Sequence, residues 1–149
     1  MRALGLDLGT KRIGVAVSDR SGTIASPLTV IQRGRRRAED HQRIAELVAE
    51  EEAELVVVGM PLHLSGAAGA SAKSAATEAE QLATVVGVPV TTHDERLTTV
   101  TADRALREAS VRGADRRAVV DKVAAAVMLQ AWLDSGGPAR ARGQQGAPS

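Results

Sequence analysis

Three acidic residues lie where a folded α/β domain could bring them together. Asp7 falls in an alternating stretch that predicts a strand, Glu95 follows another predicted strand, and Asp121 belongs to a long predicted helix. If these elements pack side by side, the carboxylates repel one another, so they share a proton or hold a cation. Oxygen ligands in a chain with no cysteine and three histidines favour Mg²⁺ or Mn²⁺ over zinc. Two such ions could stabilise the attacking and leaving oxygens of a phosphodiester displacement.

The same acids are equally consistent with a simpler arrangement. Glu95 precedes Arg96 and Asp121 precedes Lys122, so each acid could form an ion pair at the surface. Asp7 could accept hydrogen bonds from nearby backbone N–H groups. The residue types and their spacing leave both interpretations open.

The opening hairpin favours a functional role for Asp7. Residues 3–19 sort into two alternating strands in which leucine, isoleucine and valine share one face. The opposite face carries glycine and alanine around Asp7, and an acid inside a strand requires a partner or a metal. A face with so little side-chain bulk leaves room for a helix, a phosphate or an ion to approach closely.

Hydrophobic patterning predicts the elements that would position these acids. A third strand is expected over 22–31, at a sheet edge because it contains Pro27. Next come a helix over 38–52, a buried strand over 55–59, a helix over about 71–86, a strand over 88–92, a helix over about 97–109 and a last helix from the N-cap Asp115 to Gly136. We expect a three-layer α/β fold with a mixed five-stranded sheet, three antiparallel strands followed by parallel ones, and helices on both faces. Ala124–Ala126 would let the last helix approach the bare face around Asp7.

Composition narrows the classes of function. The net charge is only +1, and Trp132 is the single aromatic residue, which argues against single-strand binding by base stacking. We expect one domain over 1–135 and a disordered tail over 136–149. No apolar run reaches membrane-spanning length and no signal peptide is visible, so a cytoplasmic protein without membrane contact is expected.

A basic stretch follows the third predicted strand. Arg33, Arg35, Arg36 and Arg37 are predicted to lie in a loop. One interpretation is a solvated run of charge, and the other is a patch that contacts phosphate.

Residues 5–19 closely resemble the opening of the YqgF family, also called RuvX, a family of bacterial RNase H-like proteins related to the Holliday-junction resolvase RuvC. Three further segments resemble the family in the right order: Val57–Leu62 with Gly66 and Gly69, Asp94–Thr99, and Asp121–Asp134. The resemblance covers about residues 1–135 and implies an RNase H-like nuclease, a hydrolase. It implies that Asp7, Glu95 and Asp121 are the catalytic carboxylates and that they bind Mg²⁺ or Mn²⁺.

The resemblance also implies a nucleic-acid substrate. Lys11 and Arg12 would contact phosphate beside the acids, with Arg96 and the Arg35, Arg36 and Arg37 run as further candidates. The expected role is processing of the 5′ end of pre-16S rRNA during ribosome biogenesis, with the small subunit as a candidate context. Holliday-junction resolution on branched DNA and a catalytically silent RNA-binding module remain alternatives, as do a monomer and a homodimer. His63 and Ser65 stand where the family commonly has Asn and an acid, in a loop expected to touch substrate.

Overall fold

The computed structural model describes residues 1–60, 70–94 and 113–137. Along the chain its elements are β1 (Ala3–Leu8), β2 (Arg12–Ser18), β3 (Ala25–Gln32), α1 (Arg37–Glu50), β4 (Leu55–Met60), α2 (Ala70–Ala83), β5 (Val90–Asp94) and α4 (Gly113–Asp134). The predicted helix over 97–109 lies outside the described residues, as does the predicted tail beyond residue 137. No helix in the described ranges has the length and apolar character needed to cross a membrane.

The strands form a five-stranded mixed sheet in the order β3-β2-β1-β4-β5. β1 pairs with β2 and β2 with β3 in antiparallel fashion, whereas β4 is parallel to both β1 and β5. The mixed sheet was predicted from the sequence, and so was the edge position of β3, which holds Pro27. Because β1, β4 and β5 run in the same direction, their carboxyl ends meet at one edge of the sheet.

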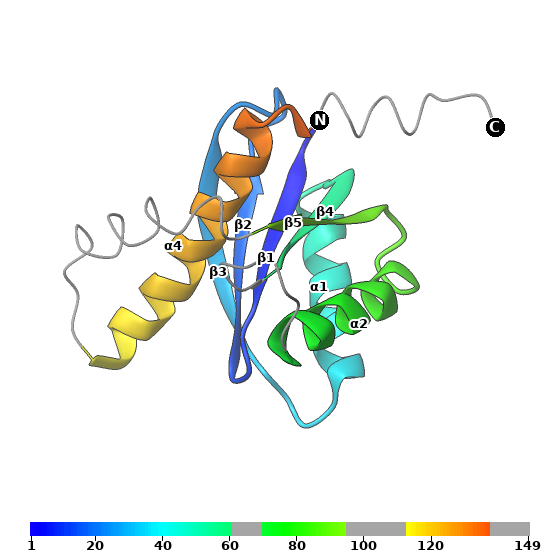
Figure 1. Cartoon of the computed structure of the whole chain (residues 1–149), viewed down its shortest axis with the longest axis vertical. Helices are drawn as coiled ribbons and strands as arrows, with labels where there is room; N and C mark the ends of the chain where they lie inside the picture. The colour runs from blue at the N-terminus through cyan, green and yellow to red at the C-terminus, as the bar shows by residue number, and fades with distance from the viewer. Residues whose placement is uncertain (61–69, 95–112, 138–149) are drawn as a thin grey trace.

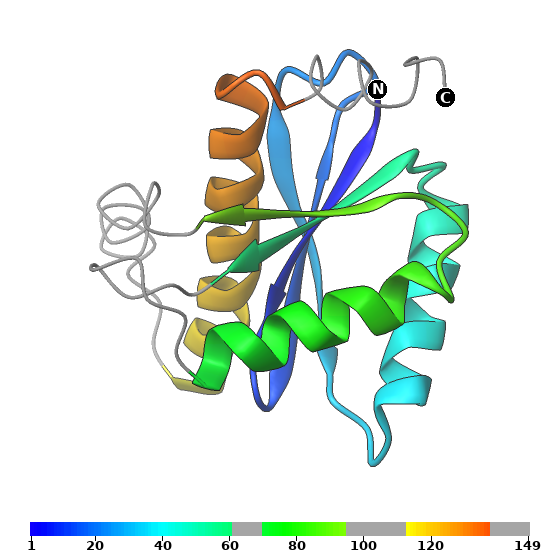
Figure 2. The same cartoon turned by 45° about the vertical axis from the view of Figure 1, so that its right-hand side comes forward.

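Helices cover both faces of the sheet. Figures 1 and 2 show α4 (yellow to orange) on one side and α1 (cyan) and α2 (green) on the other. Alternate residues of β1 divide between the two resulting cores: Leu4 and Leu6 pack toward α1 and α2, whereas Ala3 packs with Leu129 and Trp132 of α4. The period-2 pattern of the opening hairpin therefore becomes a three-layer fold.

Glycines on the bare face allow α4 to lie directly against the sheet. A Cβ atom placed on Gly5 would lie 2.9 Å from the Cβ of Leu129. A Cβ atom on Gly14 would collide with the backbone carbonyl oxygen of Asp121. The expectation that the small residues around Asp7 receive the last helix is confirmed.

Some element boundaries differ from the predictions. α4 begins at Gly113, so Asp115 lies inside the helix and the prediction of an N-cap there is wrong. β3 begins at Ala25 rather than residue 22, because Asp19 Oδ1 accepts hydrogen bonds from the N–H groups of Thr23 (2.8 Å) and Ile24 (3.1 Å) and holds these residues in a turn. α1 ends at Glu50, before Glu52, which has a φ of 54° in the left-handed region.

Candidate active site

Asp7 stands near the carboxyl end of β1, half-buried, on the face that α4 covers. Its partner across the antiparallel pair is Gly14, and opposed residues project to the same face of a sheet. The backbone of Asp121 rests on Gly14. The structure therefore brings Asp7 close to the amino-terminal half of α4. Asp7 and Asp121 are 114 positions apart in the sequence (121 − 7).

Asp121 forms an ion pair with Arg12, the first residue of β2. The Arg12 Nε atom lies 2.6 Å from Asp121 Oδ2, and each side chain is 23% exposed. Of the two interpretations of Asp121, the one in which it pairs with Lys122 differs from the structure, where its ion-pair partner is Arg12 of the hairpin. Arg12, predicted to contact phosphate, is engaged with an acid in this structure.

Glu95 and Arg96 lie outside the described residues. Asp94 ends β5 opposite Met60, at the sheet edge where β1 also ends. Within the described ranges, no group of three or more His, Cys, Asp or Glu side chains is arranged to hold a metal ion, and these ranges do not include Glu95, the third predicted acid. Asp7 and Asp121 nevertheless supply the carboxylate oxygens that Mg²⁺ and Mn²⁺ prefer. The guanidinium on Asp121 shows that this carboxylate already accepts a cation.

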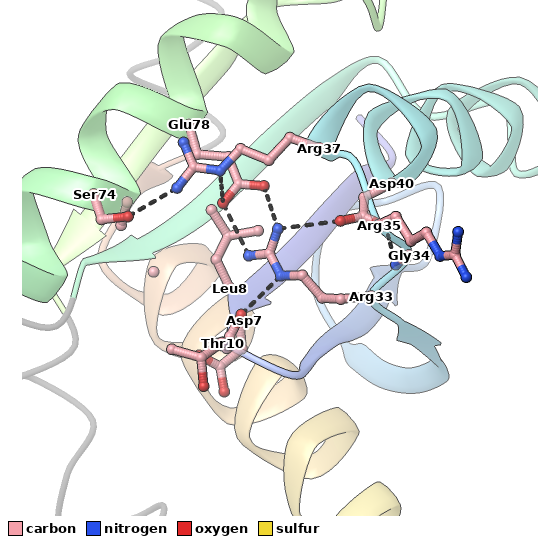
Figure 3. Close-up of a pocket in the computed structure, with 13 residues that line it drawn as sticks. Asp7, Leu8, Thr10, Arg33, Gly34, Arg35, Arg37, Asp40, Ser74 and Glu78 are labelled. Carbon is pink, nitrogen blue, oxygen red and sulfur yellow. Dashed lines mark hydrogen bonds and ion pairs between the residues drawn. The ribbon is translucent and has the colours of Figure 1, made fainter.

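A pocket of about 640 Å³ opens beside the carboxyl end of β1. Its walls come from β1 and the following turn (Asp7–Thr10), from the stretch between β3 and α1 (Arg33, Gly34 and Arg35), from Arg37 and Asp40 of α1, from Gly59 of β4 and from Ser74, Ala75 and Glu78 of α2. Figure 3 shows Arg33 and Glu78 pointing toward each other across this pocket, while the end of the Arg35 side chain extends away from them.

Charged groups buried beside the pocket neutralise one another. Arg33 donates to both carboxylate oxygens of Glu78, at 2.7 and 2.9 Å. The His41 Nε2 atom lies 2.8 Å from Glu78 Oε2, and Asp40 lies 3.4 Å from Arg33. Burial raises the pKa of Glu78, but the hydrogen bonds from Arg33 and His41 and the nearby positive charges outweigh burial and bring the pKa below its usual value. Glu78 is therefore ionised at neutral pH, so His41 Nε2 carries the proton of their hydrogen bond.

The basic stretch is not a single loop, because Arg37 begins α1 and both Arg33 and Arg37 contact Glu78. Arg33 is held by Glu78, and Arg37 is the first residue of α1 and donates to the Ser74 hydroxyl at 2.9 Å. Arg35 and Arg36 are exposed, and neither forms an ion pair with another described residue. Lys11 is also exposed, in the turn between β1 and β2. Fewer basic side chains are therefore free of acidic partners than the basic residues of the sequence suggest, because Arg12, Arg33 and Arg37 each contact a carboxylate.

The cluster around Glu78 was not predicted from the sequence. One signal was available: Glu78 interrupts the apolar helical stripe formed by Ala75, Ala79 and Leu82, all of which are buried. An acid at such a position must be paired or neutral once folded, because burying an unpaired charge is costly. The stripe indicates that a partner exists, and the fold identifies it as Arg33.

Comparison with known proteins identifies the family. A sequence model of the family described as "RuvX: Holliday junction resolvase" matches residues 1–135. A protein of Mycobacterium ulcerans is 51% identical over 134 residues, covering 89% of this chain and 78% of its own length. A protein of Mycobacterium leprae is 51% identical over 144 residues, covering 94% and 78%. Both carry the name "Putative pre-16S rRNA nuclease".

Among solved structures, the fold matches RuvC of Thermus thermophilus in complex with a Holliday junction substrate. The TM-score is 0.60 at 18% identity, covering 91% of this chain and 96% of the RuvC chain. The likeness establishes an RNase H-like fold, in agreement with the strand order of the sheet and with helices on both of its faces. Because the family model matches residues 1–135, and the fold agrees with that of RuvC, this chain belongs to the RuvX family.

Proposed function

We propose that this protein is a metal-dependent endonuclease that hydrolyses phosphodiester bonds in the processing of the 5′ end of pre-16S rRNA, in the cytoplasm. The observation that carries the proposal is the placement of Asp7 and Asp121 on one face of the sheet, across Gly14. Family membership supports the nuclease activity, and the names of the mycobacterial relatives support the ribosomal substrate.

Asp7, Asp121 and Glu95 would hold Mg²⁺ or Mn²⁺ and are the proposed catalytic residues. A bound metal would activate water and stabilise the charge that develops on the scissile phosphate. Lys11, exposed in the turn that follows Asp7, would bind a phosphate beside the acids. Arg35, which lines the pocket, and its exposed neighbour Arg36 would contact the substrate backbone farther along, and Arg96 is a further candidate. Arg12 would remain bound to Asp121 Oδ2 until a metal takes its place.

Branched DNA is the second candidate substrate. The matched RuvC structure contains a Holliday junction, and phosphate contacts by themselves do not distinguish DNA from RNA. The two substrates make different demands on assembly. Symmetrical cleavage of a four-way junction requires two active sites related by a two-fold axis, and therefore a dimer, whereas cleavage at one RNA end requires a single site.

The decisive experiment is cleavage by the purified protein with Mn²⁺ on two substrates. One is an RNA that spans the immature 5′ end of small-subunit rRNA, and the other is a synthetic four-way DNA junction. We expect the RNA to be cut and the junction to remain intact. Asp7→Asn serves as the control for contaminating nuclease and should show no cleavage above background. Its unfolding temperature should equal or exceed that of the wild type, because one repelling carboxylate is gone.

Other outcomes would change the proposal in specific ways. Cutting of the junction alone, by a protein that sediments as a dimer, would assign the protein to recombination. Binding of the RNA without cutting, with or without Mn²⁺, would indicate a catalytically silent assembly module. An Asp7→Asn protein that cuts as fast as the wild type would show that Asp7 is not a metal ligand.

A further inference from the structure

Arg33 holds the turn between β1 and β2 at two points. Its backbone N–H donates to the carbonyl oxygen of Lys11 at 3.0 Å, and its side-chain Nε donates to the carbonyl oxygen of Gly9 at 2.9 Å. The turn is tight, because a Cβ atom on Gly9 would lie 2.5 Å from the carbonyl oxygen of Arg12. The turn that begins at Gly9, two residues after Asp7, is thus held both by close contacts within its own backbone and by hydrogen bonds from Arg33.

Two helices fix the guanidinium of Arg33. Glu78 of α2 receives the two bonds of the bidentate pair, and Asp40 of α1 lies 3.4 Å away. The Glu78 side chain is 2% exposed and the Arg33 side chain 15%. Asp40 in turn accepts a hydrogen bond from the N–H of Gly34 at 2.8 Å, so the backbone next to Arg33 is held as well. A bidentate pair of this kind constrains direction as well as distance.

The surroundings of Glu78 indicate that the pair specifies position more than it adds stability. Beside Glu78, α2 buries Ala75 and Ala79, whose small side chains provide little shape to fix the helix along the sheet. A buried ion pair generally adds little net stability over apolar residues of the same volume. A bidentate Arg–carboxylate pair does constrain the relative orientation of its two side chains. Leu82 of the same helix also packs in the core, and Glu78 is the charged group that links the position of α2 to Arg33 and, through Arg33, to the turn.

We propose that Arg33 and Glu78 are a positioning pair, which couples the seating of α2 to the conformation of the β1–β2 turn and so sets the placement of Asp7 and Lys11. The consequence for cleavage rests on the proposed function, whereas the coupling itself does not. Neither residue touches the reacting atoms in this scheme. Both act through the Gly9 carbonyl oxygen.

The first test measures the turn directly, without nuclease activity. Glu78→Gln keeps the size of the side chain and removes its charge, and Arg33→Lys keeps the charge and removes the fork. Glu51→Gln is the matched control, because it breaks the ion pair of Glu51 with Arg2 (2.9 Å) away from the pocket. Amide hydrogen exchange is followed by NMR at Gly9, whose N–H donates to the backbone carbonyl oxygen of Asp7, and at Arg33, whose N–H donates to that of Lys11. Amides of β4 serve as the reference for global unfolding.

We expect exchange at Gly9 and Arg33 to become about tenfold faster in Glu78→Gln and Arg33→Lys, relative to the β4 amides, and to stay unchanged in Glu51→Gln. Where the wild type cleaves RNA, kcat should fall about tenfold in both variants, with KM changed less than about twofold, because a small misplacement of the acids slows the chemical step. Failure of the nuclease proposal would leave the exchange result standing.

A double variant keeps the proposal testable if a single substitution leaves an unpaired buried charge and the protein fails to fold. Arg33→Met with Glu78→Met replaces the pair by apolar side chains of similar volume, a change that buried ion pairs often tolerate. We expect this protein to fold and still to show fast exchange at Gly9. Wild-type exchange at Gly9 in the double variant would overturn the proposal. The same conclusion follows if the single variants lower only the unfolding temperature while turn exchange and kcat remain those of the wild type.

Discussion

At the scale of single residues, Arg12 and Asp121 tie the hairpin to the last helix beside Asp7. Their ion pair joins β2 to α4 at 2.6 Å. Ion pairs that solvent still reaches contribute little to stability, so this pair, 23% exposed on each side, matters chiefly for what Asp121 can bind. A metal that binds Asp121 through Oδ2 must displace the Arg12 guanidinium. Arg12 and the metal therefore compete for one carboxylate.

This competition predicts the effect of Arg12→Gln. We expect Mn²⁺ to raise the unfolding temperature of this variant at a concentration about two- to fivefold lower than for the wild type, since an ion pair of this kind is worth about 0.2–1 kcal/mol. Thermal unfolding across a Mn²⁺ titration measures the midpoint. Arg20→Gln is the control, because it breaks an exposed pair with Glu52 elsewhere. A Mn²⁺ midpoint equal to that of the wild type would show that Arg12 and the ion do not compete for Asp121.

Glu78 makes stability depend on acid pH. Its pKa in the folded state lies below that of an unfolded chain, despite burial, because Arg33 and His41 hydrogen-bond to it. Its contribution is therefore fully present above about pH 4.3, the ordinary value for Glu, and is lost as the pH falls through the folded-state pKa. Glu78→Gln lacks this contribution, so the wild type and the variant should approach each other in free energy of unfolding as the pH falls from 7 to 3.

Urea denaturation at a series of pH values measures this difference. At pH 7 the variant should be less stable by about 3 kcal/mol, the usual cost of leaving one partner of a buried pair without its counter-charge. Asp19, whose pKa is also lowered, by hydrogen bonds from Thr23, Ile24 and Ser21, remains in both proteins and cancels in the comparison. A gap that stays constant with pH would mean that folding does not lower the pKa of Glu78.

At the scale of elements, the contact of α4 with the glycine-bearing face determines where Asp121 lies. Gly14 and Gly5 are both needed for close approach, but only Gly14 touches the backbone of Asp121, whereas Gly5 meets the side chain of Leu129. Substitutions at the two glycines can therefore distinguish an effect on the packing of α4 from an effect on the position of Asp121.

Gly14→Ala and Gly5→Ala form a matched pair of variants. Each should lower the free energy of unfolding by about 1–3 kcal/mol through overpacking. Only Gly14→Ala should also weaken Mn²⁺ binding, because its methyl group displaces the backbone that carries Asp121. Fluorescence of Trp132 reports the unfolding of the α4 layer specifically, since this buried residue is the only aromatic one in the chain. Equal Mn²⁺ affinity in the two variants would contradict the placement of Asp121 in the metal site.

At the scale of the whole molecule, the charge is nearly balanced, at +1, so affinity for a polyanion depends on local clusters. Arg33 and Arg37 are engaged with Glu78 and with α2, which leaves Arg35 and Arg36 as exposed arginines of the stretch without an ion pair to another described residue. Binding through this stretch should therefore depend on these two side chains.

Replacing Arg35 and Arg36 together by Ala should weaken RNA binding and flatten its dependence on salt. The slope of log K against log salt should fall by about 1.4 to 1.8, the contribution expected from two phosphate contacts. Filter binding between low and physiological salt measures the slope. Arg20→Ala, which removes an exposed arginine elsewhere, should leave it unchanged. A slope equal to that of the wild type would show that the stretch is only solvated.

The sequence by itself determined the features that depend on local patterns. The period-2 alternation of residues 3–19 predicted the hairpin and its two faces, and the glycines on one face predicted close packing of a helix. Pro27 predicted the edge strand. These features could be predicted because alternation, side-chain size and the missing N–H of proline act on the residues that carry them and their immediate neighbours.

Only the tertiary structure decided which charged groups meet. Arg12 and Asp121 are 109 residues apart, and Arg33 and Glu78 are 45 apart, so no local spacing relates them. A buried acid in the apolar stripe of α2 requires a partner, but every arginine of the chain satisfies that requirement equally until the strands and helices are placed. Charge pairing depends on the distance between the two groups in space. The order of the strands and the packing of the helices on each face of the sheet set that distance, and so they determine which arginine pairs with Glu78.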